Sequence, residues 1–286
     1  MSAALYKKPI PGLVAFTIAF LSQWLGHTAW AFTRGAFGEY HEIAELLIGA
    51  VGLLLIWLGL NKPEVPATWM GFLGGSLVWV GWFEFGFAYF AKMFAVPDWT
   101  SPTGLPVNAG GAMLMATMPL MLALFLMYGF FNRQTKCNMI RWFHRKTGAN
   151  PGLPTANNGR HYARVTAMET IFVVWFCYLF WLYAGYMLSN TAIMVVYSGW
   201  LAWTVYIFIK LLKFPRVGNA VRYGIPVGIV SWGVVEMPSH FGLYSEIWLK
   251  PFEYPLTSLA ILAVFVAGFV YVASPPDRRA AKQATA

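Results

Sequence analysis

The sequence predicts an all-α integral membrane protein, a bundle of about eight transmembrane helices. The first observation is composition: 58% of the 286 residues are hydrophobic and only 11% are charged. A soluble domain usually carries about 25% charged residues. Such a composition argues against a water-soluble domain, a disordered tail, a nucleic-acid-binding domain and a disulfide-stapled secreted module, so no nucleic-acid partner is expected.

The second observation is a series of long apolar runs. A helix needs roughly 20 apolar residues to cross a bilayer. The runs are separated by proline and polar clusters such as Asn61-Lys62-Pro63. We therefore expect the bilayer itself as a partner and a single transmembrane domain with spans at about 12–32, 41–60, 68–94, 110–131, 165–188, 190–212, 223–243 and 254–274.

The third observation is the distribution of positive charge. If the N-terminus is cytoplasmic, all 20 lysines and arginines except Arg34, Lys92 and Lys250 fall on the inner side. This asymmetry predicts cytoplasmic N- and C-termini in a bacterial-type cytoplasmic (inner) membrane. The basic loop 132–164 then acts chiefly as a cytoplasmic stop signal, and binding of anionic lipid or of a partner is the alternative.

A short motif occurs twice at similar depth. The third span contains Gly81-x-x-Glu84, and the seventh contains Gly233-x-x-Glu236. A parallel repeat of two four-helix halves, 1–131 and 165–286, would explain the match. Coincidence is the alternative.

Two carboxylates inside spans are the candidate catalytic residues, Glu84 and Glu236. An ionisable group within the bilayer costs about 2.5–3.5 kcal/mol on insertion scales, so it persists when it is paired or functional. Glu84 lies between aromatic residues well inside its span, where a short carboxylate cannot reach the interface. A hydrogen-bonded structural glutamate is the alternative for this position.

Histidines in the outer half extend this set. Residues four apart share a helix face, which pairs His41 with Glu45 and Glu236 with His240. Mixed imidazole and carboxylate ligands suit transition metals, here iron or copper. For Glu45 the alternative is an ordinary acid at a helix N-terminus. The predicted metal ligands are His27, His41, Glu45, Glu84, Glu236 and His240, with His27 and His240 also predicted to bind a cofactor.

Four functions follow from this pattern. The first is a metal-dependent oxidoreductase, or a subunit of a membrane complex, with its site in the outer (periplasmic) half and a lipid-soluble substrate. The second is a respiratory anchor that oxidises quinol, with quinone or with haem b held by two of His27, His41 and His240. The third is a proton- or cation-coupled transporter that uses Glu84 and Glu236. The fourth is a non-catalytic scaffold for other membrane subunits.

Overall fold

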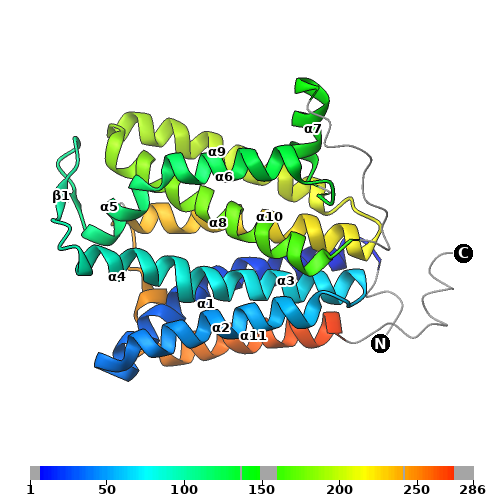
Figure 1. Cartoon of the computed structure of the whole chain (residues 1–286), viewed down its shortest axis with the longest axis horizontal. Helices are drawn as coiled ribbons and strands as arrows, with labels where there is room; N and C mark the ends of the chain where they lie inside the picture. The colour runs from blue at the N-terminus through cyan, green and yellow to red at the C-terminus, as the bar shows by residue number, and fades with distance from the viewer. Residues whose placement is uncertain (1–6, 136, 149–159, 241, 274–286) are drawn as a thin grey trace, which may run out of the picture.

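The computed structural model describes residues 7–135, 137–148, 160–240 and 242–273. Within them the chain is almost wholly helical, and the long helices lie side by side in one elongated bundle (Figure 1). The elements are α1 (Ile10–Phe37), η2 (Gly38–Tyr40), α2 (His41–Gly59), α3 (Glu64–Val78), η3 (Trp79–Glu84), α4 (Phe85–Met93), α5 (Ala109–Ala116), α6 (Met118–Phe131), α7 (Asn138–Thr147), α8 (Tyr162–Met187), α9 (Asn190–Leu211), α10 (Val217–His240), η5 (Ile247–Leu249) and α11 (Pro255–Ala273).

The described part of the chain contains four helical segments that are long and apolar enough to cross a membrane. They are Ile10–Gly59, Ala109–Phe131, Tyr162–Met187 and Asn190–Leu211. The first of them holds two helices, because the chain reverses at η2, where Gly38 has a φ of 51°. These segments agree with an all-α membrane protein. A helix also occupies each of the other predicted spans, whereas the number of true crossings stays a prediction.

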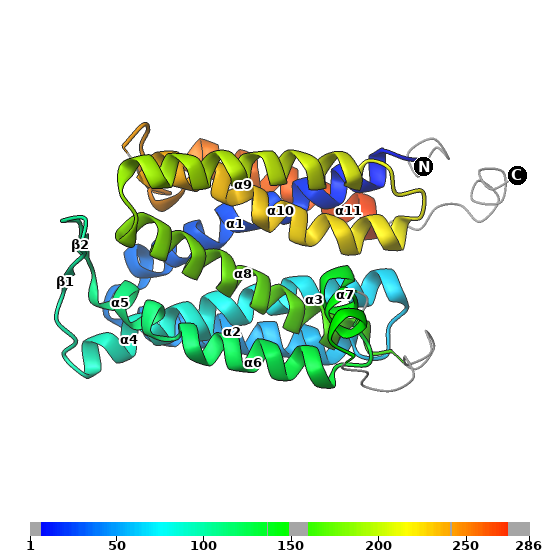
Figure 2. The same ribbon diagram turned by 90° about the horizontal axis from the view of Figure 1, so that it is seen from above.

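The helices alternate in direction along the bundle (Figures 1 and 2). The start of α1, the end of α11 and the connections around residues 60–63 and 212–216 lie at one end, and η2 lies at the other. The grouping of these connections at opposite ends matches the alternation of inner and outer loops that the charge pattern predicts.

Two connecting segments contain structure that the sequence analysis did not predict. A small antiparallel hairpin, β1 (Trp99–Thr100) and β2 (Pro106–Val107), joins α4 to α5. Helix α7 lies inside the basic loop 132–164. The sequence predicts a loop at 132–164 because α7, ten residues long and rich in charge, is too short and too polar for a span.

Glycines allow α3 to approach its neighbours closely. A Cβ on Gly71 would overlap the carbonyl of Ala163 in α8, and a Cβ on Gly75 would lie 2.8 Å from the carbonyl oxygen of Ala167. Where α3 faces α2, a Cβ on Gly74 would lie 2.6 Å from the carbonyl oxygen of Gly52. These small residues let the helix backbones meet directly, as is typical of helices that pack within lipid.

Helices α1 and α10 pack in the same manner. A Cβ on Gly224 would lie 2.7 Å from the Ala15 methyl group, and one on Gly228 would lie 2.6 Å from the Ala19 methyl group. The contact therefore repeats every four residues along both helices. It fixes the depth of α10 relative to α1.

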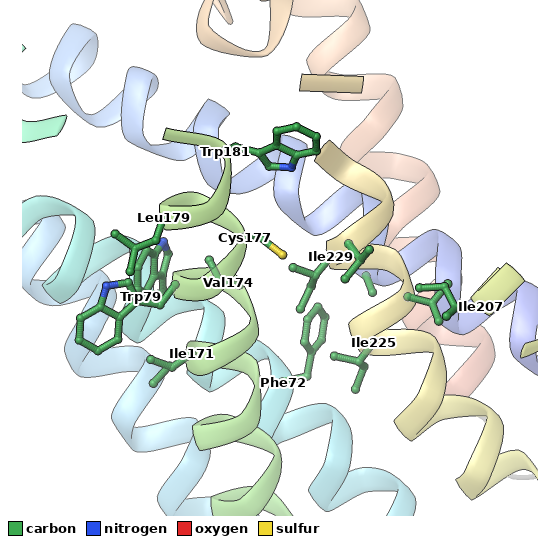
Figure 3. Packing of buried hydrophobic residues seen from close by; sticks show 14 of the residues in the cluster. Phe72, Trp79, Ile171, Val174, Cys177, Leu179, Trp181, Ile207, Ile225 and Ile229 are labelled. Carbon is green, nitrogen blue, oxygen red and sulfur yellow. The ribbon is translucent and has the colours of Figure 1, made fainter. Parts of the chain in front are cut away.

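The apolar core fills the space between α3, α8 and α10. Phe72, Cys177, Ile225 and Ile229 meet there (Figure 3). Phe72 is fully buried, and Cys177 is a free, buried thiol. Cys177 therefore acts as a small apolar side chain in the core.

We predict that Gly71→Ala destabilises the protein because the new methyl group meets the backbone of α8. Overpacking of this kind costs about 1–3 kcal/mol. The matched control is Gly86→Ala in α4, where a Cβ has nothing within 4 Å. Thermal unfolding in detergent should show a lower Tm for Gly71→Ala alone, and equal Tm values for the two variants would contradict the packing described here.

Candidate functional site

Four helical elements bring ionisable and hydroxyl side chains together inside the bundle. Nε2 of His27 (α1) lies 3.3 Å from Oε1 of Glu236 (α10). The hydroxyl of Tyr178 (α8) lies 3.3 Å from the same nitrogen. Glu84, at the end of η3, completes the set, and we call these four residues the His27 cluster.

Glu84 lies beside the other members of the cluster. It is within electrostatic range of His27, Glu236 and Tyr178. The two carboxylates predicted to be catalytic therefore share one site, with an imidazole and a phenol between them. Both carboxylates and His27 are partly buried, and the His27 side chain is only 12% exposed.

The cluster is enclosed by aromatic rings. The His27 ring stacks on Trp232 with centroids 5.8 Å apart, and the Tyr178 ring lies 5.6 Å from Trp79. Since these rings exclude water, hydrogen bonds and charges in the cluster interact more strongly than they would in solvent.

A turn of π-helix places Glu84. Residues Trp79–Glu84 form the π-helical element η3, and ordinary α-helix precedes and follows it. The indole of Trp82 donates a hydrogen bond to the carbonyl oxygen of Leu46 at 3.1 Å, which ties this turn to α2. Single π-turns inside helices occur frequently at functional sites.

A small cavity adjoins the cluster between α1, α8 and α10. Its volume is about 10 Å³, and Gln23, Tyr178, Trp181 and Glu236 contribute to its lining. A space of this size is comparable with a single water molecule. The cavity therefore leaves room for about one water molecule beside Glu236.

Glu45 forms a separate ion pair beside the cluster. It is fully buried, its Oε1 lies 3.3 Å from Nε of Arg34, and Thr33 donates a hydrogen bond to the same oxygen at 3.4 Å. The Arg34 guanidinium lies over the Trp30 ring, 4.3 Å from its centroid. This pair links α1 to α2, and Glu45 remains within electrostatic range of Glu84.

The structure places the remaining histidines differently. His41 is partly exposed, and its Nδ1 lies 2.9 Å from the carbonyl oxygen of Gly38, so it closes the turn at the start of α2. Helix α10 continues through Pro238 to His240, which preserves the four-residue spacing from Glu236. The side chain of His240 lies outside the described part of the structure.

The described side chains do not form a metal-binding arrangement. Over the described residues, no group of three or more His, Cys, Asp and Glu side chains could hold a metal ion. Nε2 of His27 faces Glu236 and Tyr178. The predicted ligands that the structure describes thus interact with protein partners.

Sequence reasoning missed Tyr178, Arg34 and Thr33. Tyr178 is one of several tyrosines in its span, among them Tyr183 and Tyr186, and nothing in the sequence separates it from them. Arg34 was assigned only to the outer loop because α1 extends beyond the predicted span end to Phe37. The one available signal was an arginine near an acidic helix start.

Comparison with protein-family models, with curated proteins and with solved structures finds no match to this chain. The site is therefore interpreted from its own geometry.

We predict unequal effects for the two partners of the Arg34–Glu45 pair. Arg34→Met leaves a fully buried carboxylate without its cation and should destabilise the protein by about 3 kcal/mol. Glu45→Gln leaves a cation that is 32% exposed and can reach solvent, so its cost should be closer to about 1 kcal/mol. Thermal unfolding of both variants and of the double variant checks this order, and a larger loss for Glu45→Gln would contradict it.

Proposed function

We propose that this protein is a proton-coupled membrane transporter in which the His27 cluster takes up and releases the coupling proton. The observation that carries the proposal is the direct juxtaposition of Glu84, Tyr178, His27 and Glu236 inside the bundle. Ionisable residues within membrane-spanning helices mark proton relays and ion pathways by default.

The chemistry of the cluster suits proton exchange. Imidazole accepts and donates protons near neutral pH, and its two partners at 3.3 Å are a carboxylate and a phenol. Glu84 lies within electrostatic range of both His27 and Tyr178 and provides a second proton acceptor. A proton can thus pass between Glu236, His27 and Tyr178 through contacts of 3.3 Å, and Glu84 adjoins this chain.

A repeated sequence pattern supports a transporter. The helices that carry the two carboxylates share two glycines four residues apart, a tryptophan four residues later, and then a Gly-x-x-Glu motif. The paired positions are Gly71 and Gly224, Gly75 and Gly228, Trp79 and Trp232, Gly81 and Gly233, and Glu84 and Glu236.

The packing of these helices follows the same pattern. Gly71 and Gly75 meet alanines of α8, the first helix of the second half, whereas Gly224 and Gly228 meet alanines of α1, the first helix of the first half. Two parallel repeats that exchange contacts in this manner would place one carboxylate from each half at a common centre. We propose this duplication as the framework of the transport site.

The proposed topology has eight crossings, with both termini in the cytoplasm of a bacterial-type cell and the protein in its cytoplasmic membrane. The alternating helices and the charge distribution support it (Figure 1). The His27 cluster would then lie in the outer half of the membrane.

The geometry favours proton exchange over the two cofactor-based functions. Nε2 of His27 faces a carboxylate and a phenol, the partners that suit proton exchange. The cavity beside Glu236 is close to the size of one water molecule, far smaller than a quinone. No described contact favours the metal-dependent oxidoreductase or the quinol-oxidising anchor.

Proton movement in proteoliposomes tests the proposal. A pH-sensitive dye inside the vesicles would report proton entry while a membrane potential or a gradient of Na⁺ or K⁺ is imposed. We expect Glu84→Gln and Glu236→Gln to slow proton entry by roughly 10²-fold, because each removes one proton-accepting group.

The matched control is Glu169→Gln, which changes another glutamate of the helix bundle. Glu169 accepts hydrogen bonds from Thr135 at 2.6 Å and from Tyr128 at 3.3 Å, away from the cluster. The Glu169→Gln variant should leave proton entry unchanged. Wild-type vesicles that admit no protons under any of these gradients, or equal losses in all three variants, would contradict the proposal.

We predict an intermediate effect for Tyr178→Phe. This variant keeps the ring that packs on Trp79 but removes the hydroxyl between His27 and Glu84. The loss of one hydrogen bond of about 1 kcal/mol predicts a roughly fivefold slower proton entry, with a loss of stability no larger than about 1 kcal/mol. The proteoliposome assay and thermal unfolding together check this result, and a Tyr178→Phe protein as fast as wild type would remove Tyr178 from the proposed path.

A further inference from the structure

Helix α7 (Asn138–Thr147) lies crosswise at one end of the bundle. It follows α6, runs across the direction of the long helices and extends beyond their outline (Figures 1 and 2). If the long helices cross the bilayer, a helix with this orientation lies along the membrane surface. Its position therefore brings it to the level of the lipid headgroups.

One face of α7 is anchored to the end of α6. Ile140 is only 4% exposed, and the Phe143 ring lies 5.4 Å from that of Phe130. The imidazole of His144 donates a hydrogen bond from Nε2 to the carbonyl oxygen of Gly129. These contacts fix which face of α7 points away from the bundle.

The opposite face combines three cations with an aromatic ring. Arg141, Arg145 and Lys146 are exposed, and Trp142 is 54% exposed. Positions 141 and 145, like 142 and 146, lie one turn apart, so the four side chains form a single surface. Arginine and lysine beside tryptophan are typical of helices that lie in the membrane interface.

The surroundings of α7 add to the positive charge. Lys62, Lys213 and Arg216 lie in connections at the same end of the bundle, the end predicted to face the cytoplasm. The cytoplasmic leaflet carries anionic lipids that attract basic segments close to a membrane helix. The described surface therefore complements a layer of phosphate groups.

We propose that the outer face of α7 binds the phosphate headgroups of anionic phospholipids. Arg141 and Arg145 would each offer a planar fork of N–H donors to phosphate oxygens, Lys146 would add a point charge, and Trp142 would rest at the headgroup level. This surface is separate from the His27 cluster, and the proposal does not depend on the transport function.

Quenching of Trp142 fluorescence provides the test. The full chain would be reconstituted into phosphatidylcholine vesicles that contain brominated phosphatidylglycerol or, separately, brominated phosphatidylcholine. The difference between wild type and Trp142→Phe isolates the signal of this one tryptophan. We expect brominated phosphatidylglycerol to quench it more strongly than brominated phosphatidylcholine at the same mole fraction.

The decisive variant neutralises the three cations of α7, Arg141→Gln, Arg145→Gln and Lys146→Gln. Its preference for phosphatidylglycerol should fall by roughly fivefold for each charge removed. The control, Lys213→Gln with Arg216→Gln, removes exposed cations at the same end but not on α7 and should keep most of the preference. Arg141→Lys with Arg145→Lys retains the charge and should also keep most of it, which separates loss of binding from loss of folding.

Three results would overturn the proposal. One is equal quenching by the two brominated lipids in the wild type. Another is an equal loss of preference in the α7 variant and in the control. The third is relief of quenching by millimolar inorganic phosphate, which would identify a site for free phosphate in place of a lipid.

Discussion

The direct contact of helix backbones at pairs of small residues determines where the polar side chains of this protein meet. Helices in lipid gain little from burying apolar surface, so close packing and hydrogen bonds set their relative depth. Gly71 and Gly75 fix α3 against α8, and Gly224 and Gly228 fix α10 against α1. Tyr178 and Glu84 come together through the first contact, and His27 and Glu236 come together through the second.

The His27 cluster in turn shapes the packing around it. A carboxylate far from water is costly unless it is paired; Glu236 is paired with His27, and Glu84 lies within electrostatic range of the same imidazole. The rings of Trp79 and Trp232 cover these partners and leave only a water-sized space beside Glu236. The proposed proton exchange would need little rearrangement of such a site, whereas a larger substrate would require the helices to move.

The apolar runs predicted the helical segments well, because a helix in lipid must satisfy its own backbone and needs a fixed length. The partners of the polar side chains could not be predicted in the same way. The spacing on α2 relates Glu45 to His41, but its ion pair with Arg34 depends on the rotation of α1 against α2, which no spacing reveals. Tyr178 looked like any other tyrosine of an aromatic span. Sequence spacing relates residues along one helix, while the cluster depends on contacts between four.

In the proposed repeat, the π-turn accommodates one extra residue without losing the site. Glu84 follows Gly75 by one residue more than Glu236 follows Gly228. In a regular α-helix each residue turns the chain by about 100°, so the additional residue would point Glu84 away from the position that corresponds to Glu236. A π-helical turn is wider and absorbs one residue. The π-turn runs from Trp79 to Glu84. The glycines before it can therefore face α8 while the carboxylate at its end still faces the cluster. The irregular turn thus preserves the geometry that brings Glu84 to Tyr178.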